Sequence, residues 1–191
     1  MVSKVHKQKP KRKCTKTYAN YTSFKPYIRE DFNKRCGYCD DLDLFHGGVR
    51  GYQIDHFRPH SIAKFTHLKE AYSNLIYSCP FCNRAKWHKW KENGFIDPCE
   101  NLYDEHLARC GNGKLKYKSL RGKYIYENLN LYLQRHEVLW SIERIQEQKK
   151  ELKTYLKKLD FKSDKYKEII NQFIIYDDEI EKYYGIYYSE I

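Results

Sequence analysis

The sequence lacks long runs of apolar residues, both near its start, where a secretory signal would carry one, and throughout the rest of the chain. No segment approaches the ~18 consecutive apolar residues that a membrane-spanning helix requires. The chain also contains no internal repeat. We therefore expect a soluble, cytoplasmic protein that has no membrane partner.

Acidic side chains are too few to balance the basic ones: 25 Asp and Glu stand against 36 Lys and Arg, which gives a net charge of +11. The excess is concentrated in residues 1–35, which carry 11 basic and 2 acidic side chains. A basic segment of this kind suits phosphate backbones or acidic surfaces, although a solubilising tail has the same composition. We expect residues 1–22 to form a flexible basic arm.

The rest of the chain has the composition of a folded protein, with 41% hydrophobic and 16% aromatic residues. A strand is predicted around "YQIDHF" at residues 52–57, after a glycine-rich turn. From about residue 128 apolar residues recur at helical spacing, and "DFKSD" interrupts the pattern, which predicts a helical hairpin. The expected fold class is α+β, with a domain over residues 23–127 and a helical region over residues 128–191.

A disulfide framework is not expected, because the seven cysteines are odd in number and no secretion signal precedes them. Four of them form two short CxxC pairs, which predict a structural zinc site, although the 39 residues between the pairs exceed the gap of a common zinc ribbon: Cys36, Cys39, Cys79 and Cys82. A redox role would require a βαβ context that is missing here. The other three are interpreted as ordinary thiols: Cys14, Cys99 and Cys110.

The stretch "YQIDHFRPHS" places Asp55 and His56 side by side between the two cysteine pairs. Adjacent strand residues point to opposite faces, so both can serve one site only if the strand ends or bulges there. Pro59 favours such an ending. Alone, an Asp-His pair is more often a surface or helix-capping pair, but this context favours a functional one.

The segments "CGYC", "IDHFRP" and "SNLIYSCPFCNRAK" together resemble the motif of the HNH endonuclease family, in its four-cysteine form with a ββα-metal core, over residues 36–86. A weaker resemblance links "FIDPCEN" and "LNLYLQRHEVLW" to HNH proteins of Septu-type prokaryotic antiviral defence systems. The second resemblance implies a defence subunit whose C-terminal helices dock on an ATPase.

The HNH resemblance also implies roles for individual residues. His56 takes the place of the general base, and a histidine with a pKa near ~6.5 suits that task. Asp55 and Asn83 take the places of the ligands of a catalytic Mg²⁺ or Mn²⁺, whose preferred ligands are oxygens. Asn74 takes the place of the asparagine that orients the loop and the base. The family's last histidine is here Asn83, and His88 is the other candidate.

Basic residues flank the proposed site and are candidates for phosphate contacts, or equally for solvated charges: Arg58, Arg84 and Lys86. Trp87 and Trp90 are interpreted as core residues rather than base-stacking platforms. The sequence therefore predicts a metal-dependent endonuclease that hydrolyses DNA, with a structural zinc ion. The alternative is a non-catalytic, zinc-braced nucleic-acid-binding module or adaptor subunit.

Overall fold

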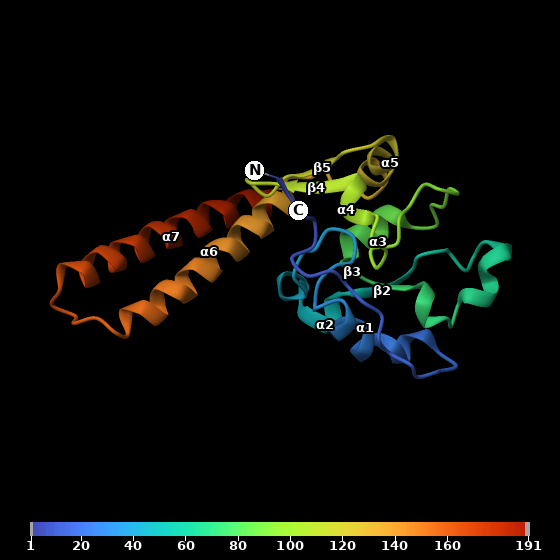
Figure 1. Cartoon of the computed structure of the whole chain (residues 1–191), viewed down its shortest axis with the longest axis horizontal. Helices are drawn as coiled ribbons and strands as arrows, with labels where there is room; N and C mark the ends of the chain where they lie inside the picture. The colour runs from blue at the N-terminus through green and yellow to red at the C-terminus, as the bar shows by residue number, and fades with distance from the viewer. Residues whose placement is uncertain (1, 190–191) are drawn as a thin grey trace. The chain divides into compact units, whose positions relative to one another are not determined.

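The computed structural model describes residues 2–189, which divide into two compact units after Leu133. This division lies a few residues beyond the expected boundary between residues 127 and 128. The first unit mixes short helices with short strands (Figure 1), and both cysteine pairs belong to it. The second unit consists of two long helices.

The elements of the first unit are short, and most are joined by loops and 3₁₀ turns. Its strands are β1 (Val2–Ser3), β2 (Gln53–His56), β3 (Leu75–Ser78), β4 (Leu107–Cys110) and β5 (Leu115–Tyr117). Its α-helices are α1 (Lys25–Asp31), α2 (Gly48–Gly51), α3 (Pro80–Lys86), α4 (Tyr103–His106) and α5 (Leu120–Asn128). Its 3₁₀ turns are η1 (Tyr21–Phe24), η2 (Asp43–His46), η3 (Ala63–Leu68) and η4 (Tyr72–Asn74).

Strands β2 and β3 form an antiparallel pair in which Asp55 lies opposite Ile76 and His56 lies opposite Leu75. All four residues of β3 are buried, whereas β2 begins at the exposed Gln53 and becomes buried toward His56. Helix α3 follows β3 at once, because Pro80 occupies its first position and the Cys79 side chain caps it. The order strand, strand, helix therefore places residues 53–56 and 80–86 beside each other.

The N-terminal segment is packed against the first unit, which corrects the expectation of a flexible arm. Strand β1 pairs with β4 in the three-stranded sheet β1-β4-β5. Val5 is buried, and its amide donates to a carboxylate oxygen of Asp104 at 2.9 Å. Arg12 forms an ion pair of 2.9 Å with Asp97. Distant carboxylates thus bind a segment that has no apolar periodicity of its own.

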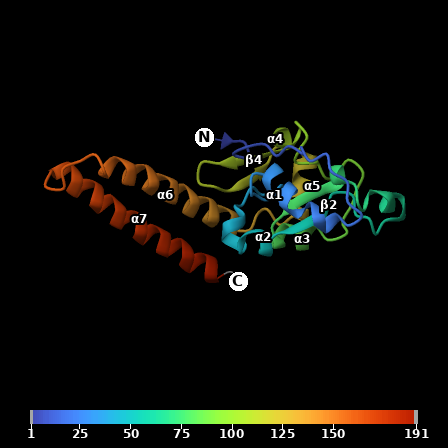
Figure 2. The same ribbon diagram turned by 90° about the horizontal axis from the view of Figure 1, so that it is seen from below.

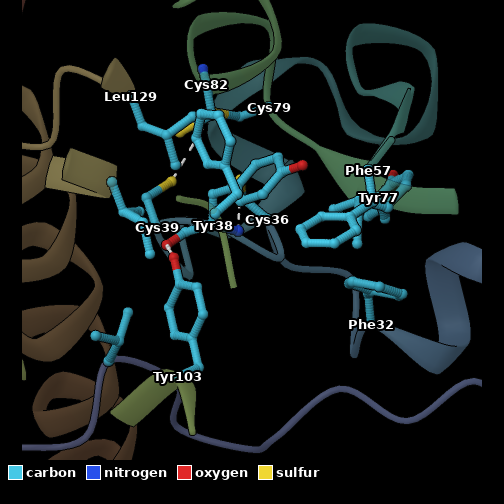
Figure 3. Close-up of a cluster of buried hydrophobic side chains, with 14 of the residues drawn as sticks. Phe32, Cys36, Tyr38, Cys39, Phe57, Tyr77, Cys79, Cys82, Tyr103 and Leu129 are labelled. Carbon is cyan, nitrogen blue, oxygen red and sulfur yellow. Dashed lines mark hydrogen bonds between the residues drawn. The ribbon is translucent and has the colours of Figure 1, made fainter. Parts of the chain in front are cut away.

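An aromatic core surrounds the cysteines, and its polar groups are paired (Figure 3). Tyr38, Tyr52, Tyr77 and Tyr103 are all at most 1% exposed. The hydroxyl of Tyr103 donates to the main-chain carbonyl of Tyr38 at 2.6 Å, and the hydroxyl of Tyr77 donates to Asp43 at 2.9 Å. Each tyrosine adds apolar area to the core, while these bonds offset the cost of burying a hydroxyl.

The second unit contains helices α6 (Arg135–Leu156) and α7 (Asp164–Ser189), which run side by side in both views (Figures 1 and 2). The break between them falls at the expected "DFKSD" segment. Lys149 on α6 forms an ion pair with Asp177 on α7, and Ile145 and Ile169 are buried. Among residues 2–189, no helix combines the length and apolar character that crossing a membrane requires.

Candidate active site

Two chain turns bring the four paired cysteines together in the core of the first unit (Figure 3). All four are buried, and their sulfur atoms lie within 4.8 Å of one another. The amides of Tyr38 and Cys82 donate to the sulfurs of Cys36 and Cys79, each at 3.4 Å. These residues could bind a zinc ion, because four convergent thiolates are the usual ligand set of a closed tetrahedral site.

The electrostatics of this cluster also suit a divalent cation. Burial opposes ionisation of Cys36, but hydrogen bonds from the other three cysteines outweigh it and hold its pKa well below the ordinary value. Burial in turn raises the pKa of Cys39 well above the ordinary value. Metal ligation requires the thiolate form, so a bound cation would have to displace the proton of Cys39.

Asp55 is held in place by two buried side chains. It is buried, and its carboxylate accepts a hydrogen bond from the hydroxyl of Tyr38. The ammonium of Lys86 lies 2.9 Å from Oδ2 and 3.2 Å from Oδ1 of the same carboxylate. Burial, followed by the charge of Asp55, raises the pKa of Tyr38 well above its ordinary value, so this hydroxyl remains a donor.

Lys86 occupies a different place from the one expected of a phosphate-binding residue. Its side chain is 0% exposed, and its ammonium also donates to the main-chain carbonyl of His56 at 2.8 Å. An ammonium without solvent contact cannot reach a nucleic-acid phosphate in this arrangement. Lys86 instead links the last turn of α3 to both residues of the Asp-His pair.

The ring of His56 is fixed by one hydrogen bond and two aromatic neighbours. Its Nε2 lies 2.8 Å from the main-chain oxygen of Lys69, which can only accept, so Nε2 carries the hydrogen. In the neutral ring Nδ1 therefore has the lone pair. The rings of Tyr21 and His60 lie 4.6 and 4.3 Å away. Burial lowers the pKa of His56, which favours the neutral form.

Asn74 holds the loop that follows β2. Its Oδ1 accepts from the amide of Arg58 at 2.9 Å, and its Nδ2 donates to the carbonyl of Arg58 at 3.0 Å. Its own carbonyl accepts from the amide of Phe57 at 2.8 Å. Asn74 therefore acts on the backbone directly behind His56, and these contacts suit an orienting residue rather than a reacting one.

A cavity of about 200 Å³ unites three of the predicted site residues. The residues that line it are Ile54, Asp55, His56, Pro59, His60, Asn83, Trp87 and His88. Asn83 donates through Nδ2 to the side chain of Gln53, a bond that leaves its carbonyl oxygen available as a ligand. His88 Nδ1 is instead 3.1 Å from the hydroxyl of Ser61.

Two residues that line the cavity offer oxygen ligands of the kind that a small hard cation takes. A carboxylate offers about four acceptor positions, and only some of those on Asp55 are taken by Tyr38 and Lys86. The Asp55 carboxylate and the Asn83 amide oxygen are the ligand types that Mg²⁺ prefers, with waters in the other positions. These two residues could therefore hold such an ion beside His56.

The remaining basic and aromatic candidates lie in different settings, and Arg58 and Trp90 line a separate cavity. Arg58 and Arg84 are exposed, and the Arg58 guanidinium lies 5.9 Å from the ring centre of Trp90. Trp90 is partly buried and packs edge to face on Phe57, as expected of a core residue. Trp87 is 67% exposed, contrary to that expectation.

Three contributors to the site were not predicted from the sequence: Tyr38, Gln53 and Tyr21. Tyr38 stands inside the first cysteine pair, where its spacing gives no hint of a bond to Asp55. Gln53 lies two residues before Asp55, so strand periodicity places both on one face and could have identified it. Tyr21 reaches His56 only through the tertiary fold.

Part of the chain is similar in sequence to known proteins. Residues 36–89 match the HNH endonuclease family. The chain is also similar to the Septu protein PtuB of Bacillus mycoides (strain KBAB4), with 28% identity over 126 residues. That alignment covers 50% of this chain and 41% of the relative, so less than half of the relative's length is spanned. No solved structure matches the chain.

Proposed function

We propose, from the match of residues 36–89 to the HNH endonuclease family, that the chain is a metal-dependent endonuclease that hydrolyses phosphodiester bonds of DNA. The observation that carries the proposal is the single cavity lined by Asp55, His56 and Asn83. In this proposal β2, β3 and α3 are the ββα-metal core. A non-catalytic binding module would have no need for all three residues in one cavity.

His56 is the general base in this proposal. Its Nε2–H bond to the carbonyl of Lys69 fixes the ring and leaves Nδ1 to take a proton from the attacking water. As the imidazolium forms, the same carbonyl stabilises the developing positive charge. Asn74 keeps the following loop, and with it the end of β2, in place.

In this proposal Asp55 and Asn83 would hold the catalytic Mg²⁺ or Mn²⁺. That ion would stabilise the negative charge on the phosphate and on the leaving oxygen. Lys86 balances part of the negative charge of Asp55 and fixes its orientation. Arg58 and Arg84 are the proposed phosphate contacts, since both are exposed and each is the sequence neighbour of a residue that lines the cavity, Pro59 or Asn83. The four cysteines hold a structural zinc ion that joins the chain before β2 to the chain after β3.

The similarity to a Septu protein supports a role in prokaryotic antiviral defence. We place a docking surface for an ATPase subunit on α7, where Ile174 and Ile175 are 55% and 56% exposed. Neighbouring exposed apolar side chains on one helix are candidates for a contact with another protein. Unchanged copurification of a co-expressed ATPase after Ile175→Lys would exclude this surface.

A plasmid-nicking assay with and without Mg²⁺ tests the proposed activity. His56→Ala should lower the cleavage rate by ~10²-fold or more, which is the scale of removing a general base. His67→Ala is the matched control, because His67 is exposed and does not line the cavity. Unaltered cleavage by folded His56→Ala would refute the assignment of the base. A wild-type chain that binds DNA without cutting it would favour the binding module.

A further inference from the structure

Trp87 stands at the edge of the candidate active site and exposes 67% of its surface. It follows α3 directly, as the residue after Lys86. An indole of this size is usually buried over most of its area, because it contributes more to a core than almost any other side chain. Its exposure therefore calls for a reason other than packing.

The backbone of Trp87 is also in a conformation that tryptophan rarely adopts, with φ 49° and ψ −129°. The amide of Lys89 donates to the carbonyl of Lys86 at 2.9 Å and closes a tight turn around it. These angles match the second position of a type II′ turn, where glycine is strongly preferred. A bulky residue in this backbone conformation lowers the stability of the fold. The turn nevertheless holds the Trp87 indole at the edge of the cavity.

The surroundings of Trp87 keep its position defined and make it attractive to nucleic acid. Its ring packs edge to face on His88 at 4.8 Å, and His88 is held by the hydroxyl of Ser61. Arg84, three residues earlier in the sequence, is exposed as well. An exposed aromatic face beside a cationic side chain is the arrangement that binds single-stranded nucleic acids.

We infer that Trp87 is a stacking platform for an unpaired base next to the scissile phosphate, an inference that rests on the proposed nuclease function. Within a duplex both faces of a base are covered by its neighbours, so the indole can stack fully only on a base that is unpaired or flipped out. The preferred substrate class is therefore nucleic acid with a single-stranded segment at the cut. Arg84 holds the adjacent phosphate.

The test uses His56→Ala as the parent, so that binding is measured without cleavage. Fluorescence anisotropy gives the affinity for a labelled single-stranded DNA oligonucleotide and for the duplex of the same sequence. Trp87→Ala should weaken single-strand binding by about 10-fold, within the range of one base-aromatic stack. It should change duplex binding much less. Trp87→Phe should retain most of the affinity, and an oligonucleotide containing 2-aminopurine should be quenched by the parent but not by Trp87→Ala.

Two further variants separate stacking from a structural role. Trp87→Gly should lose the same affinity while raising the melting temperature, because glycine adopts this backbone without strain. Tyr132→Ala is the matched control, an aromatic residue that is 56% exposed but does not line the cavity. The inference is overturned if Trp87→Ala binds single strands as the parent does, or if Trp87→Gly lowers the melting temperature.

The outcomes also distinguish this inference from the proposed function. A wild-type chain that cuts DNA while Trp87→Ala keeps its single-strand affinity refutes the platform and leaves the nuclease intact. A chain that stacks 2-aminopurine on Trp87 but never cuts retains the platform and refutes the nuclease. A parent that binds no nucleic acid refutes both.

Discussion

Replacing Lys86 with methionine should destabilise the first unit more than its position at the end of a short helix suggests. The Lys86 ammonium is 0% exposed and lies 2.9 Å from the carboxylate of Asp55, which is itself only 8% exposed. Methionine has nearly the same length, so the change removes the charge without leaving a large cavity. The carboxylate then remains buried without its counter-charge.

The size of the effect follows from this burial. Breaking a buried ion pair by removing one partner costs about 3–5 kcal/mol, because the remaining charge is uncompensated. The hydroxyl of Tyr38 still donates to Asp55, so we expect the lower end, about 3 kcal/mol. The main-chain carbonyl of His56 also loses a donor, which displaces the site as well as weakening it.

Urea unfolding of the zinc-loaded protein, followed by circular dichroism, measures this loss in free energy of unfolding. Arg84→Met is the matched control: it lies on the same helix and is exposed, so its effect should stay within ~0.5 kcal/mol. The double variant Asp55→Asn with Lys86→Met should recover part of the loss, because the buried charge is gone. A Lys86→Met protein as stable as the Arg84→Met control would refute the buried-pair argument.

Two other predictions concern the metal sites. Cys79→Ser should release about one zinc ion per chain in elemental analysis and destabilise the first unit, whereas Cys110→Ser, outside the cluster, should retain zinc. Asn83→Ala should abolish Mg²⁺-supported cutting while leaving zinc content and DNA binding intact, and His88→Ala should be mild. The reverse result, an inactive His88→Ala and an active Asn83→Ala, would make His88 the ligand.

Local spacing made much of the candidate site predictable. Two cysteine pairs and an Asp-His pair are patterns of a few residues, and each pattern indicates its chemistry without knowledge of the fold. The clustering of Cys36 with Cys82 follows from that spacing. Asp55 and His56 line one cavity because β2 ends at His56, as the nearby proline led us to expect.

The residues whose setting was predicted wrongly are held by contacts between distant parts of the chain, and no local sequence pattern contains these contacts. The sequence around Lys86 predicts a surface charge. The last turn of α3 faces β2, however, and Lys86 pairs there with Asp55, which lies 31 positions earlier in the sequence. The N-terminal arm is rich in lysine and has no periodic apolar residues, a pattern that predicts a flexible segment. It is ordered by Asp97 and Asp104, whose role becomes visible only in three dimensions.

The pairing of β1 with β4 has a consequence for how the chain is made. Val2 and Ser3 find their partners only in Cys110 and Arg109, which leave the ribosome more than a hundred residues later. At typical synthesis rates this delay is on the order of 5 to 20 seconds. Throughout that interval Val2 and Ser3 lack the strand with which they pair, whereas Lys11 and Lys13 can already bind Asp31. The three-stranded sheet β1-β4-β5 is therefore completed late in synthesis, after the residues that line the cavity have already been made.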